Sequence, residues 1–349
     1  APYEMSIRSI ITGGVGTGKT ALAQTFGKSI QEKATRRRIN VRYLHVNCRE
    51  LRGKFFMVLQ RVVKILKPQF PERGYAANEL LEIIMQILGE EDAHLILCLD
   101  EIDALIDEEG SDALYFLTRV QEDRPDDPRR LSLLCISKDA ETFKKLDRST
   151  LSSLQRNVIQ MREYSTAQLS DIVSARAEMS FRRDAIPADI VDFISELAAS
   201  EHGDARYAID LLWRSGKYAD VAYSSEVSPE HVRKAAATLF PVLREESVKQ
   251  LSLHEQLVLL AVARFFKGKR VTEATTGEIE LGYQVVCEEY EEKQRGHTQF
   301  WKYLNKLKGL DAVNIKLRSS SQGRTQLISL AKIPATDLER EVTRIIEQI

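Results

Sequence analysis

Up to residue 163, short apolar runs alternate with longer segments in which apolar residues recur every three or four positions. The runs of strand length are Ser6–Thr12, Val41–Val46, His94–Leu99 and Leu131–Ser137. The segments with helical spacing are 22–30, Phe55–Leu66, Glu79–Leu88 and Asp112–Val120. Strands that alternate with helices predict an α/β core over residues 1–163, with a parallel sheet covered by helices on both faces.

The strand pattern ends near Ser165, and the segment that follows has helical spacing alone. Ser165 and Gln168 form a capping box that begins a helix. Further helices are expected over Asp189–Ala199, Ala205–Ala222 and Pro229–Leu239, the last of them after the helix-starting pair Ser228–Pro229. This pattern predicts an α-helical lid over residues 164–243.

The last third of the chain has three helical segments followed by two short strand-like runs. Capping boxes lie at Ser252–Glu255, Thr275–Glu278 and Thr336–Glu339, and helices are expected over Leu257–Phe266, Ile279–Glu291 and His297–Lys308, with Gly309 as the stop of the third. The runs Val313–Leu317 and Gln326–Leu330 flank the basic, Ser-rich segment Arg318–Arg324. Three helices and a hairpin predict a C-terminal winged-helix domain over residues 244–349.

Composition narrows the class of protein. Of the 349 residues, 43% are hydrophobic, and no run approaches the length of a membrane span. The four cysteines lack metal-ligand spacing, so we expect a reduced, intracellular, cytoplasmic protein without structural disulfides or membrane contact. Because the net charge is −1, binding to nucleic acid would need local basic patches, and these lie in the C-terminal third.

A glycine-rich loop follows the first expected strand. It is Gly13-Gly14-Val15-Gly16-Thr17-Gly18-Lys19-Thr20, and it matches the pattern of a phosphate-binding loop. The backbone N–H groups of such a loop surround nucleotide phosphates, and a helix begins where it ends. Lys19 would reach the β- and γ-phosphate oxygens, and Thr20 would bind Mg²⁺. The sequence therefore predicts a site for ATP or ADP with Mg²⁺.

A second nucleotide signature stands at the end of the buried run Leu95–Leu99. Asp100 would hold the Mg²⁺ shell, and Glu101 would orient the attacking water. The alternative is a solvated acidic turn at the end of an ordinary strand. The phosphate loop upstream favours the nucleotide interpretation.

These motifs, Leu99–Asp103 and the segment Gly203-Asp204-Ala205-Arg206 together resemble the archaeal Orc1/Cdc6 initiators of the AAA+ superfamily over nearly the whole chain. The resemblance implies ATP-dependent binding of duplex origin DNA, with slow hydrolysis of ATP acting as a switch. It also implies loading of the replicative MCM helicase, further Orc1/Cdc6 protomers or paralogues as partners, and association with the nucleoid. Arg206 resembles the arginine of sensor 2 in the lid, although a pair with Asp210 is an alternative role.

Two positions depart from the family pattern. Lys138 stands where the family has the asparagine of sensor 1, and a lysine cannot both donate to and accept from a positioned water as an amide can. Arg148 lies one place early for the arginine finger, so it is either the finger or a surface arginine. Both departures predict slow or altered hydrolysis.

DNA contacts are predicted on the winged helix and on an insertion in the core. In the expected helix His297–Lys308, apolar Phe300, Trp301, Leu304 and Leu307 should face the core. The candidate DNA contacts are Arg295, Thr298, Gln299, Lys302 and Lys306 along the helix, Arg318, Gln322 and Arg324 in the wing, Lys269, and the insertion residues Arg73 and Gly74. Asn305 shares the outward helix face.

Two other functions fit parts of this pattern. A nucleotide-gated signalling or scaffold protein of the STAND type would use its winged helix for protein contacts, and the helix would then have an apolar outer face and no basic wing. A RuvB-like DNA motor would need an intact sensor 1 and a clear arginine finger. The basic wing and Lys138 favour the initiator over both.

Overall fold

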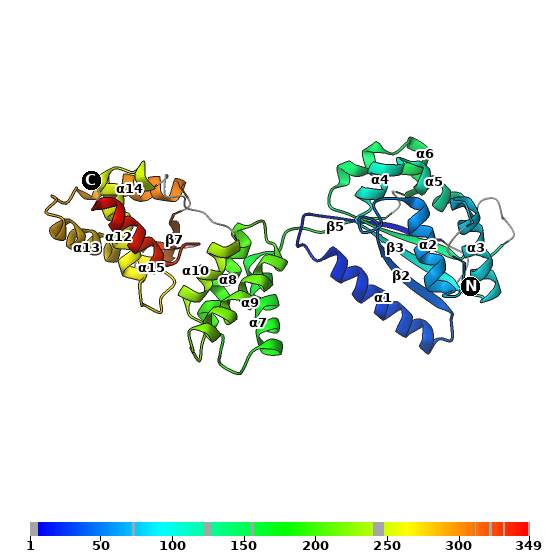
Figure 1. Ribbon diagram of the computed structural model, residues 1–349, viewed down its shortest axis with the longest axis horizontal. Helices are drawn as coiled ribbons and strands as arrows, with labels where there is room; N and C mark the ends of the chain where they lie inside the picture. Colours follow the sequence, from blue (N-terminus) through cyan, green and yellow to red (C-terminus); the bar gives the residue numbers. More distant parts are fainter. Residues whose placement is uncertain are drawn as a thin grey trace. The chain divides into compact units, whose positions relative to one another are not determined.

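We analysed a computed structural model of the chain, which describes residues 6–71, 74–121, 127–154, 157–239, 248–310, 312–320, 323–330 and 332–347, with backbone alone at 318–320 and 323–325. The chain divides into two compact units, residues 1–163 and 164–349 (Figure 1). Within these ranges no helix is long and apolar enough to cross a membrane. The four cysteines are buried free thiols.

The first unit is an α/β domain built on a parallel sheet. Its strands are β1 (Arg8–Thr12), β2 (Val41–Asn47), β3 (His94–Asp100), β4 (Leu131–Ser137) and β5 (Val158–Gln160), in the order β2-β3-β4-β1-β5. Its helices are α1 (Lys19–Arg36), α2 (Phe55–Leu66), α3 (Ala77–Glu90), α4 (Asp103–Glu109), α5 (Asp112–Arg119), the 3-10 helix η1 (Ala140–Lys145) and α6 (Arg148–Leu154). The predicted fold class is confirmed, and β5, α4, α6 and η1 were not predicted.

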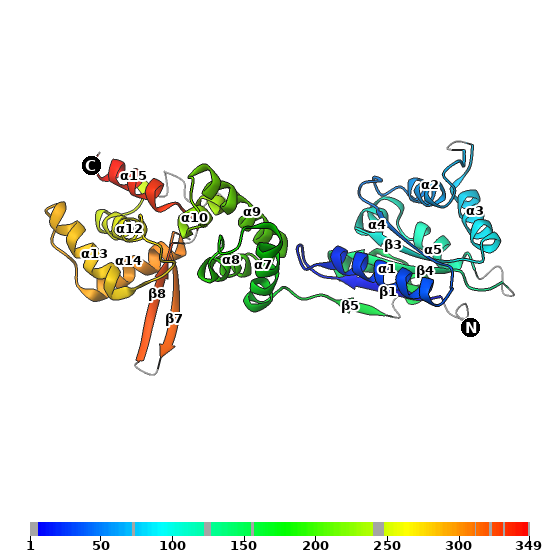
Figure 2. The same ribbon diagram turned by 90° about the horizontal axis from the view of Figure 1, so that it is seen from below.

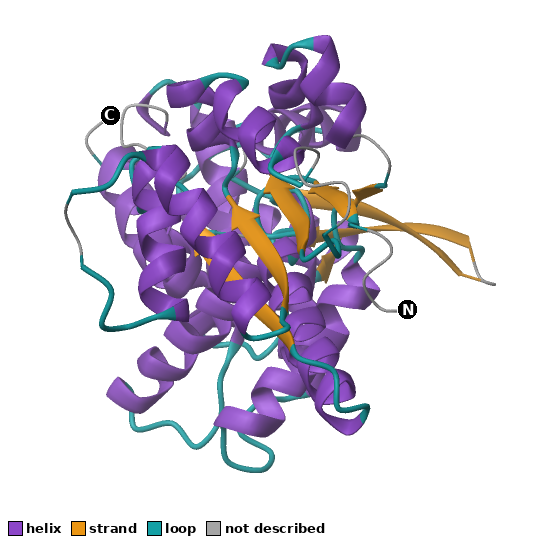
Figure 3. Cartoon of the chain, turned by 90° about the vertical axis from the view of Figure 1, so that its right-hand side faces the viewer, coloured by secondary structure: helices purple, strands orange, loops and turns teal. Residues whose placement is uncertain are grey.

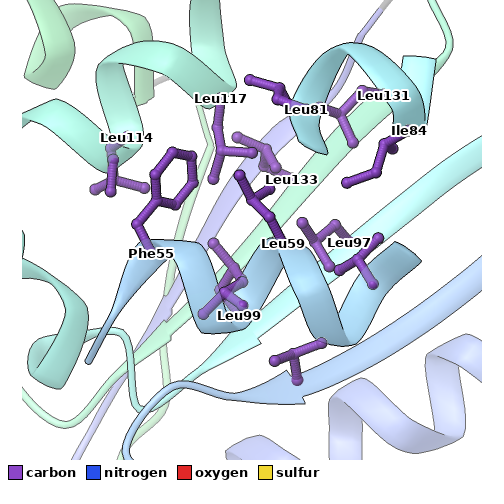
Figure 4. Packing of buried hydrophobic residues seen from close by; sticks show 14 of the residues in the cluster. Phe55, Leu59, Leu81, Ile84, Leu97, Leu99, Leu114, Leu117, Leu131 and Leu133 are labelled. Atoms are coloured by element: carbon purple, nitrogen blue, oxygen red, sulfur yellow. The ribbon is translucent and has the colours of Figure 1, made fainter. Parts of the chain in front are cut away.

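One apolar core joins the sheet to the helices on one of its faces. Alternate residues Leu97 and Leu99 of β3 and Leu131 and Leu133 of β4 point toward α2, α3 and α5 (Figure 4). All four are nearly fully buried, and each contributes about 1.5–3 kcal/mol relative to an exposed side chain. This packing holds the carboxyl ends of β3 and β4 next to the phosphate loop.

The second unit begins with four lid helices. They are α7 (Thr166–Ser180), α8 (Ala188–Ser200), α9 (Ala205–Val221) and α10 (Pro229–Leu239). The predicted capping box is present, since the Ser165 hydroxyl accepts from the N–H of Gln168 at 3.3 Å and Gln168 Oε1 accepts from the N–H of Ser165 at 3.0 Å. The lid has its own apolar core.

The rest of the second unit has the order of elements of a winged helix. These are α12 (Leu253–Phe266), β6 (Ala274–Thr275), α13 (Thr276–Glu289), α14 (His297–Gly309), β7 (Asn314–Ser320), β8 (Gly323–Ser329) and α15 (Ala335–Ile346). The three strands form an antiparallel sheet in the order β6-β8-β7. Two views agree that β7 and β8 project as an arm from the helices of their own unit (Figure 2 and Figure 3). The predicted winged helix is confirmed.

The signals predicted to stop α14 at Gly309 and to start the last helix at Thr336 do not act as predicted. α14 runs through Gly309 instead of stopping before it, because the Leu310 N–H still bonds to the Lys306 carbonyl at 3.2 Å. α15 begins at Ala335, so Thr336 lies inside the helix. The carboxylate of Glu230 in the lid accepts from the N–H groups of Ala335 at 3.2 Å and Thr336 at 3.4 Å. A distant side chain thus replaces the expected local cap.

A buried arginine joins the lid to the winged helix. Arg233 on α10 has no exposed surface, its Nε donates to the Leu330 carbonyl at 2.8 Å, and its Nη2 donates to the Val271 carbonyl at 3.4 Å. Its guanidinium lies 5.5 Å from the ring centre of Phe193 in the lid and 4.9 Å from that of Phe266 on α12. Burial lowers the pKa of Arg233 to about 10, which leaves it charged at neutral pH.

Ion pairs also link the lid to the winged helix near Arg233. Arg270 pairs with Glu226 at 3.0 Å, and Lys332 pairs with Glu201. The Arg270 side chain is 70% exposed, so its pair contributes little beside the buried arginine.

Replacing Arg233 should therefore destabilise the second unit. We expect Arg233→Ala to lower the free energy of unfolding by about 3 kcal/mol or more. The change leaves two buried carbonyls without a hydrogen-bond donor and creates a large cavity. The chain has two tryptophans, Trp213 and Trp301, and both lie in the second unit. Tryptophan fluorescence during denaturant unfolding of the full chain therefore reports on this unit alone.

The matched control is Arg270→Ala, which removes an exposed arginine from the same joint and should cost less than about 1 kcal/mol. Equal losses in the two variants would show that the buried guanidinium is not what holds the joint.

Candidate functional site

The phosphate loop connects β1 to α1, as its motif requires. A Cβ at Gly13 would lie 2.5 Å from the carbonyl oxygen of Met161, so only glycine fits there. Gly18, the residue before α1, has φ of 83°, in the left-handed region that favours glycine. Gly14, Val15, Gly16 and Thr17 complete the loop, and α1 begins directly after it, so the N-terminus of this helix lies at the loop.

Lys19 is the first residue of α1, and its side chain folds back over the loop. Its Nζ donates to the carbonyls of Gly13 and Gly14, both at 2.6 Å. The ammonium therefore lies where a phosphate-binding loop concentrates positive charge. The predicted role of Lys19 in phosphate binding remains a prediction that this geometry supports.

The two predicted Mg²⁺ ligands are in direct contact. The Thr20 hydroxyl donates to Asp100 Oδ2 at 2.8 Å, and Asp100 is 4% exposed at the end of β3. Hydroxyl and carboxylate oxygens are the donors that Mg²⁺ prefers. Across the described ranges, no group of three or more His, Cys, Asp or Glu has the arrangement of a metal site. The pair therefore fits a metal that arrives with nucleotide phosphates.

His45 on β2 is a third member of this cluster and was not predicted. Its Nε2 lies 3.1 Å from Asp100 Oδ2, and this hydrogen bond is the main cause that raises the pKa of His45 to about 10. Burial raises the pKa of Asp100, but the hydrogen bonds from His45 and Thr20 outweigh burial and leave that pKa below its ordinary value. The hydrogen bond from the His45 imidazole thus helps to compensate the buried carboxylate.

The residues after Asp100 turn sharply away from the sheet. Glu101 has φ of 49°, which is uncommon outside glycine, and its N–H donates to Asp100 Oδ1 at 2.8 Å. Asp103, also missed by the sequence analysis, is buried and accepts from the hydroxyls of Ser137 and Thr142, both at 2.7 Å. Asp103 thus ties the end of β3 to the turn after β4.

That turn places Lys138 beside the phosphate loop. The turn and the loop line a common cavity of about 480 Å³. Its lining includes Gly13 and Gly14 of the loop, Lys138 and Asp139 of the turn, and Met161. The Lys138 N–H bonds to Asp103 at 3.3 Å, and its side chain is exposed. Lys138 therefore lies where a residue could contact a bound phosphate.

Arg148 and Arg206 both lie in the first turn of a helix. The Asp147 carboxylate accepts from the N–H groups of Ser149 and Thr150 at 2.8 and 3.0 Å, and Arg148, which directly follows Asp147, is exposed. Arg206 on α9 is also exposed and lines a lid groove with Trp213. Among the described residues Asp210 pairs with Arg214 at 3.1 Å and not with Arg206, so the alternative Arg206–Asp210 pair is not formed.

On α14, the predicted outward face is exposed. Thr298, Gln299, Lys302, Asn305 and Lys306 all lie at the surface, and Phe300, Leu304 and Leu307 are fully buried. Trp301 was expected in the core and is only half-buried, because its ring lies at the edge of the helix face that packs. Lys306 pairs with Glu255 of α12 at 2.8 Å, so part of its charge is already compensated.

The structure describes the other predicted DNA contacts to different extents. Lys269 Nζ lies 3.7 Å from the ring centre of Phe265, and Gly74 has φ of 100° in the loop between α2 and α3. Arg318 and Arg324 lie on β7 and β8 near the turn of the hairpin, with backbone alone described. Arg73 and Gln322 lie outside the described residues.

A parallel sheet with a phosphate loop after β1, an acidic end to β3, a helical lid and a winged helix together define the class of AAA+ nucleotide-binding proteins with a C-terminal winged helix. Family models agree with each part. An AAA domain matches residues 9–143, a Cdc6 AAA+ ATPase-type lid domain matches 170–237, and the CDC6 C-terminal winged-helix domain matches 246–340.

The chain is 32% identical over 333 residues to the ORC1-type DNA replication protein 2 of Saccharolobus solfataricus, covering 93% of this chain and 80% of that protein. It therefore belongs to the family of ORC1-type (Cdc6) DNA replication proteins. The crystal structure of Cdc6p from Pyrobaculum aerophilum matches it with a TM-score of 0.84 and 28% identity, covering 99% of this chain and 90% of that one.

Two Aeropyrum pernix structures are also similar. The ORC1 protein in complex with DNA has a TM-score of 0.61 and 28% identity, covering 99% of this chain and 87% of that one. The ORC2 protein in ADPNP–ADP complexes has a TM-score of 0.63 and 25% identity, covering 99% and 89%. Membership of this AAA+ family implies that the chain binds a nucleotide.

Nucleotide binding should depend on Lys19. Lys19→Ala removes the cation that the loop holds through Gly13 and Gly14, so we expect affinity for ATP to fall tenfold or more, by roughly 1.5–3 kcal/mol. Titration with a fluorescent ATP analogue measures this affinity. Lys28→Ala, an exposed lysine on the same helix, is the matched control and should bind like wild type. Equal affinity in both variants would place the phosphates elsewhere.

Proposed function

We propose that this protein is an ATP-dependent replication initiator that binds duplex origin DNA through its winged helix and the insertion loop between α2 and α3. The observation that carries the proposal is the exposed polar and basic face of α14 beside the projecting hairpin β7–β8. A helix of this kind enters the major groove while the wing follows the backbone. The similarity to the ORC1 protein in complex with DNA supports the same role.

The core supplies the nucleotide-dependent part of the proposal. Gly13–Thr20 would hold the phosphates of ATP, and Thr20 with Asp100 would hold Mg²⁺, which neutralises phosphate charge when bound. Glu101 would orient a water for hydrolysis, and Arg148 would act on a neighbouring protomer or not at all. Lys138 would hold phosphate as a charge without positioning the water, so turnover would be slow.

The lid would connect the nucleotide to DNA. Arg206 begins a lid helix, and the lid forms one compact unit with the winged helix through Arg233. A lid that changes its angle when Arg206 contacts a γ-phosphate would therefore carry the winged helix with it. This is a switch through differential contacts in two states, and the nucleotide would set how core and winged helix hold duplex DNA. The MCM helicase and further initiator protomers are the partners that we propose for it.

The signalling or scaffold alternative is less well supported. A winged helix used for protein contacts would have an apolar outer face. Here the outer face of α14 carries Thr298, Gln299, Lys302 and Asn305. The motor alternative is disfavoured by Lys138, because rapid hydrolysis needs a well-positioned water.

DNA binding can be tested by footprinting on duplex fragments selected from the genome of the source organism. The double variant Lys302→Glu, Arg324→Glu should bind at least tenfold more weakly, since each change replaces a cation of the proposed DNA interface by an anion. The slope of log affinity against log salt should also become shallower by about one for each lost contact.

Lys144→Glu is the matched control, an exposed lysine on η1 of the core. It should leave the footprint and the salt dependence unchanged. A wild-type protein that protects no duplex site at moderate salt would overturn the proposed initiator.

The rate of ATP hydrolysis tests whether the protein acts as a slow switch. Lys138→Asn restores an amide that donates and accepts, so we expect the rate of ATP hydrolysis to rise roughly tenfold. Phosphate release measured with and without DNA gives the rates. Lys144→Asn should not change them. A wild type with fast, DNA-stimulated turnover would favour a motor instead.

A further inference from the structure

A polar cluster lies inside the winged helix, beneath the turn between α13 and α14. Its centre is His254 at the start of α12, a residue that is only 8% exposed. His254 Nδ1 lies 2.8 Å from the hydroxyl of Tyr283, and its Nε2 accepts from Arg295 Nε at 2.9 Å. The ring stacks on Tyr303 of α14 with centres 6.2 Å apart and an angle of 4°. Three elements are thus joined at one imidazole.

The contact with Arg295 determines which ring nitrogen of His254 carries the proton. A guanidinium only donates hydrogen bonds, so His254 Nε2 must be the acceptor and the ring must be neutral. The proton then resides on Nδ1 and is donated to the Tyr283 oxygen. Burial, followed by the charge of Arg295, lowers the pKa of His254 below its ordinary value of 6.5, while Glu292 opposes this.

Arg295 itself points outward from the turn. It is exposed, it comes two residues before the first residue of α14, and Gly296 between them is the N-cap of that helix. The Arg295 side chain donates to His254 through Nε, and a guanidinium has further N–H donors on its two terminal nitrogens. A guanidinium fixed at one nitrogen beside a helix N-terminus is well placed for a phosphate.

We propose that His254 is a positioning residue that holds Arg295 toward a backbone phosphate of duplex DNA at the N-terminus of α14. The proposal rests on the DNA-binding function proposed above and deepens it. His254 touches no DNA in this account. It acts by fixing one end of the Arg295 side chain, which reduces the conformational entropy that Arg295 loses when it binds a phosphate.

The same ring has a second partner within reach. Glu292 Oε2 lies 3.7 Å from His254 Nε2, so a protonated ring would attract Glu292 and repel Arg295. The other titratable groups around the cluster are Tyr283 and Cys287 of α13, Tyr303 of α14, and Glu255, which Lys306 holds in an ion pair. Acidification below pH 6.5 should therefore release Arg295 and weaken DNA binding, unless His254 is removed.

The test measures binding of a duplex that wild type recognises, by fluorescence anisotropy from pH 5.5 to 8. At pH 7.5, Arg295→Ala and His254→Phe should each weaken binding about tenfold, the loss of one charge-assisted hydrogen bond, and the double variant should be no weaker than Arg295→Ala alone. Phenylalanine keeps the stacked ring and removes the acceptor. Arg340→Ala, an exposed arginine on α15 of the same domain, should bind like wild type.

His254→Gln separates positioning from a structural role. It keeps an acceptor for Arg295 but does not titrate, so it should bind within about twofold of wild type at pH 7.5 and lose the weakening that wild type shows toward pH 5.5. Additive losses in the double variant, wild-type binding by Arg295→Ala, or the same acid weakening in His254→Gln would each overturn the positioning role while DNA binding stands. A wild type that binds no duplex at any pH would overturn the proposed function itself.

Discussion

The burial of Arg233 is the interaction on which the second unit depends. A guanidinium without access to water is costly, and here the cost is offset by two carbonyls, the neighbouring carboxylate of Glu230 and two aromatic faces. The carbonyls of Val271 and Leu330 belong to the winged helix, whereas the arginine belongs to the lid. Separating the lid from the winged helix would expose the charge or leave it without its hydrogen-bond acceptors. The lid and the winged helix therefore form one body.

The link between lid and winged helix matters for the proposed effect of a nucleotide on DNA binding. A ligand shifts a two-state equilibrium only by its differential affinity for the two states, and a shift from mostly one state to mostly the other needs about 5.5 kcal/mol. If the joint between lid and winged helix yielded more easily than that, the energy of a contact at Arg206 would be absorbed there. The buried guanidinium and the Glu230 carboxylate that caps α15 both resist such yielding, as the proposed switch requires.

The sequence predicted best what is encoded locally. Strands β1 to β4, the lid helices and the capping box at Ser165 follow from apolar spacing and from residues three apart, and the structure confirms them. The misses depend on partners far along the chain. Thr336 is not a cap because Glu230 performs that task, and His45 and Asp103 enter the site only because β2, β3 and β4 lie side by side.

The sequence also overstated how much positive charge the winged helix has available. Lys306 was a predicted DNA contact, yet it pairs with Glu255, and Lys316 on the neighbouring strand β7 pairs with Glu196 of the lid. Such pairs hold the domain together and must be loosened before these lysines can neutralise phosphates. In the proposed DNA interface, affinity would then depend less on the number of basic residues than on a few exposed ones, among them Lys302 on α14 and Arg295, which His254 would hold in place. A near-neutral chain can therefore bind a polyanion wherever its own acidic residues do not compete for those side chains.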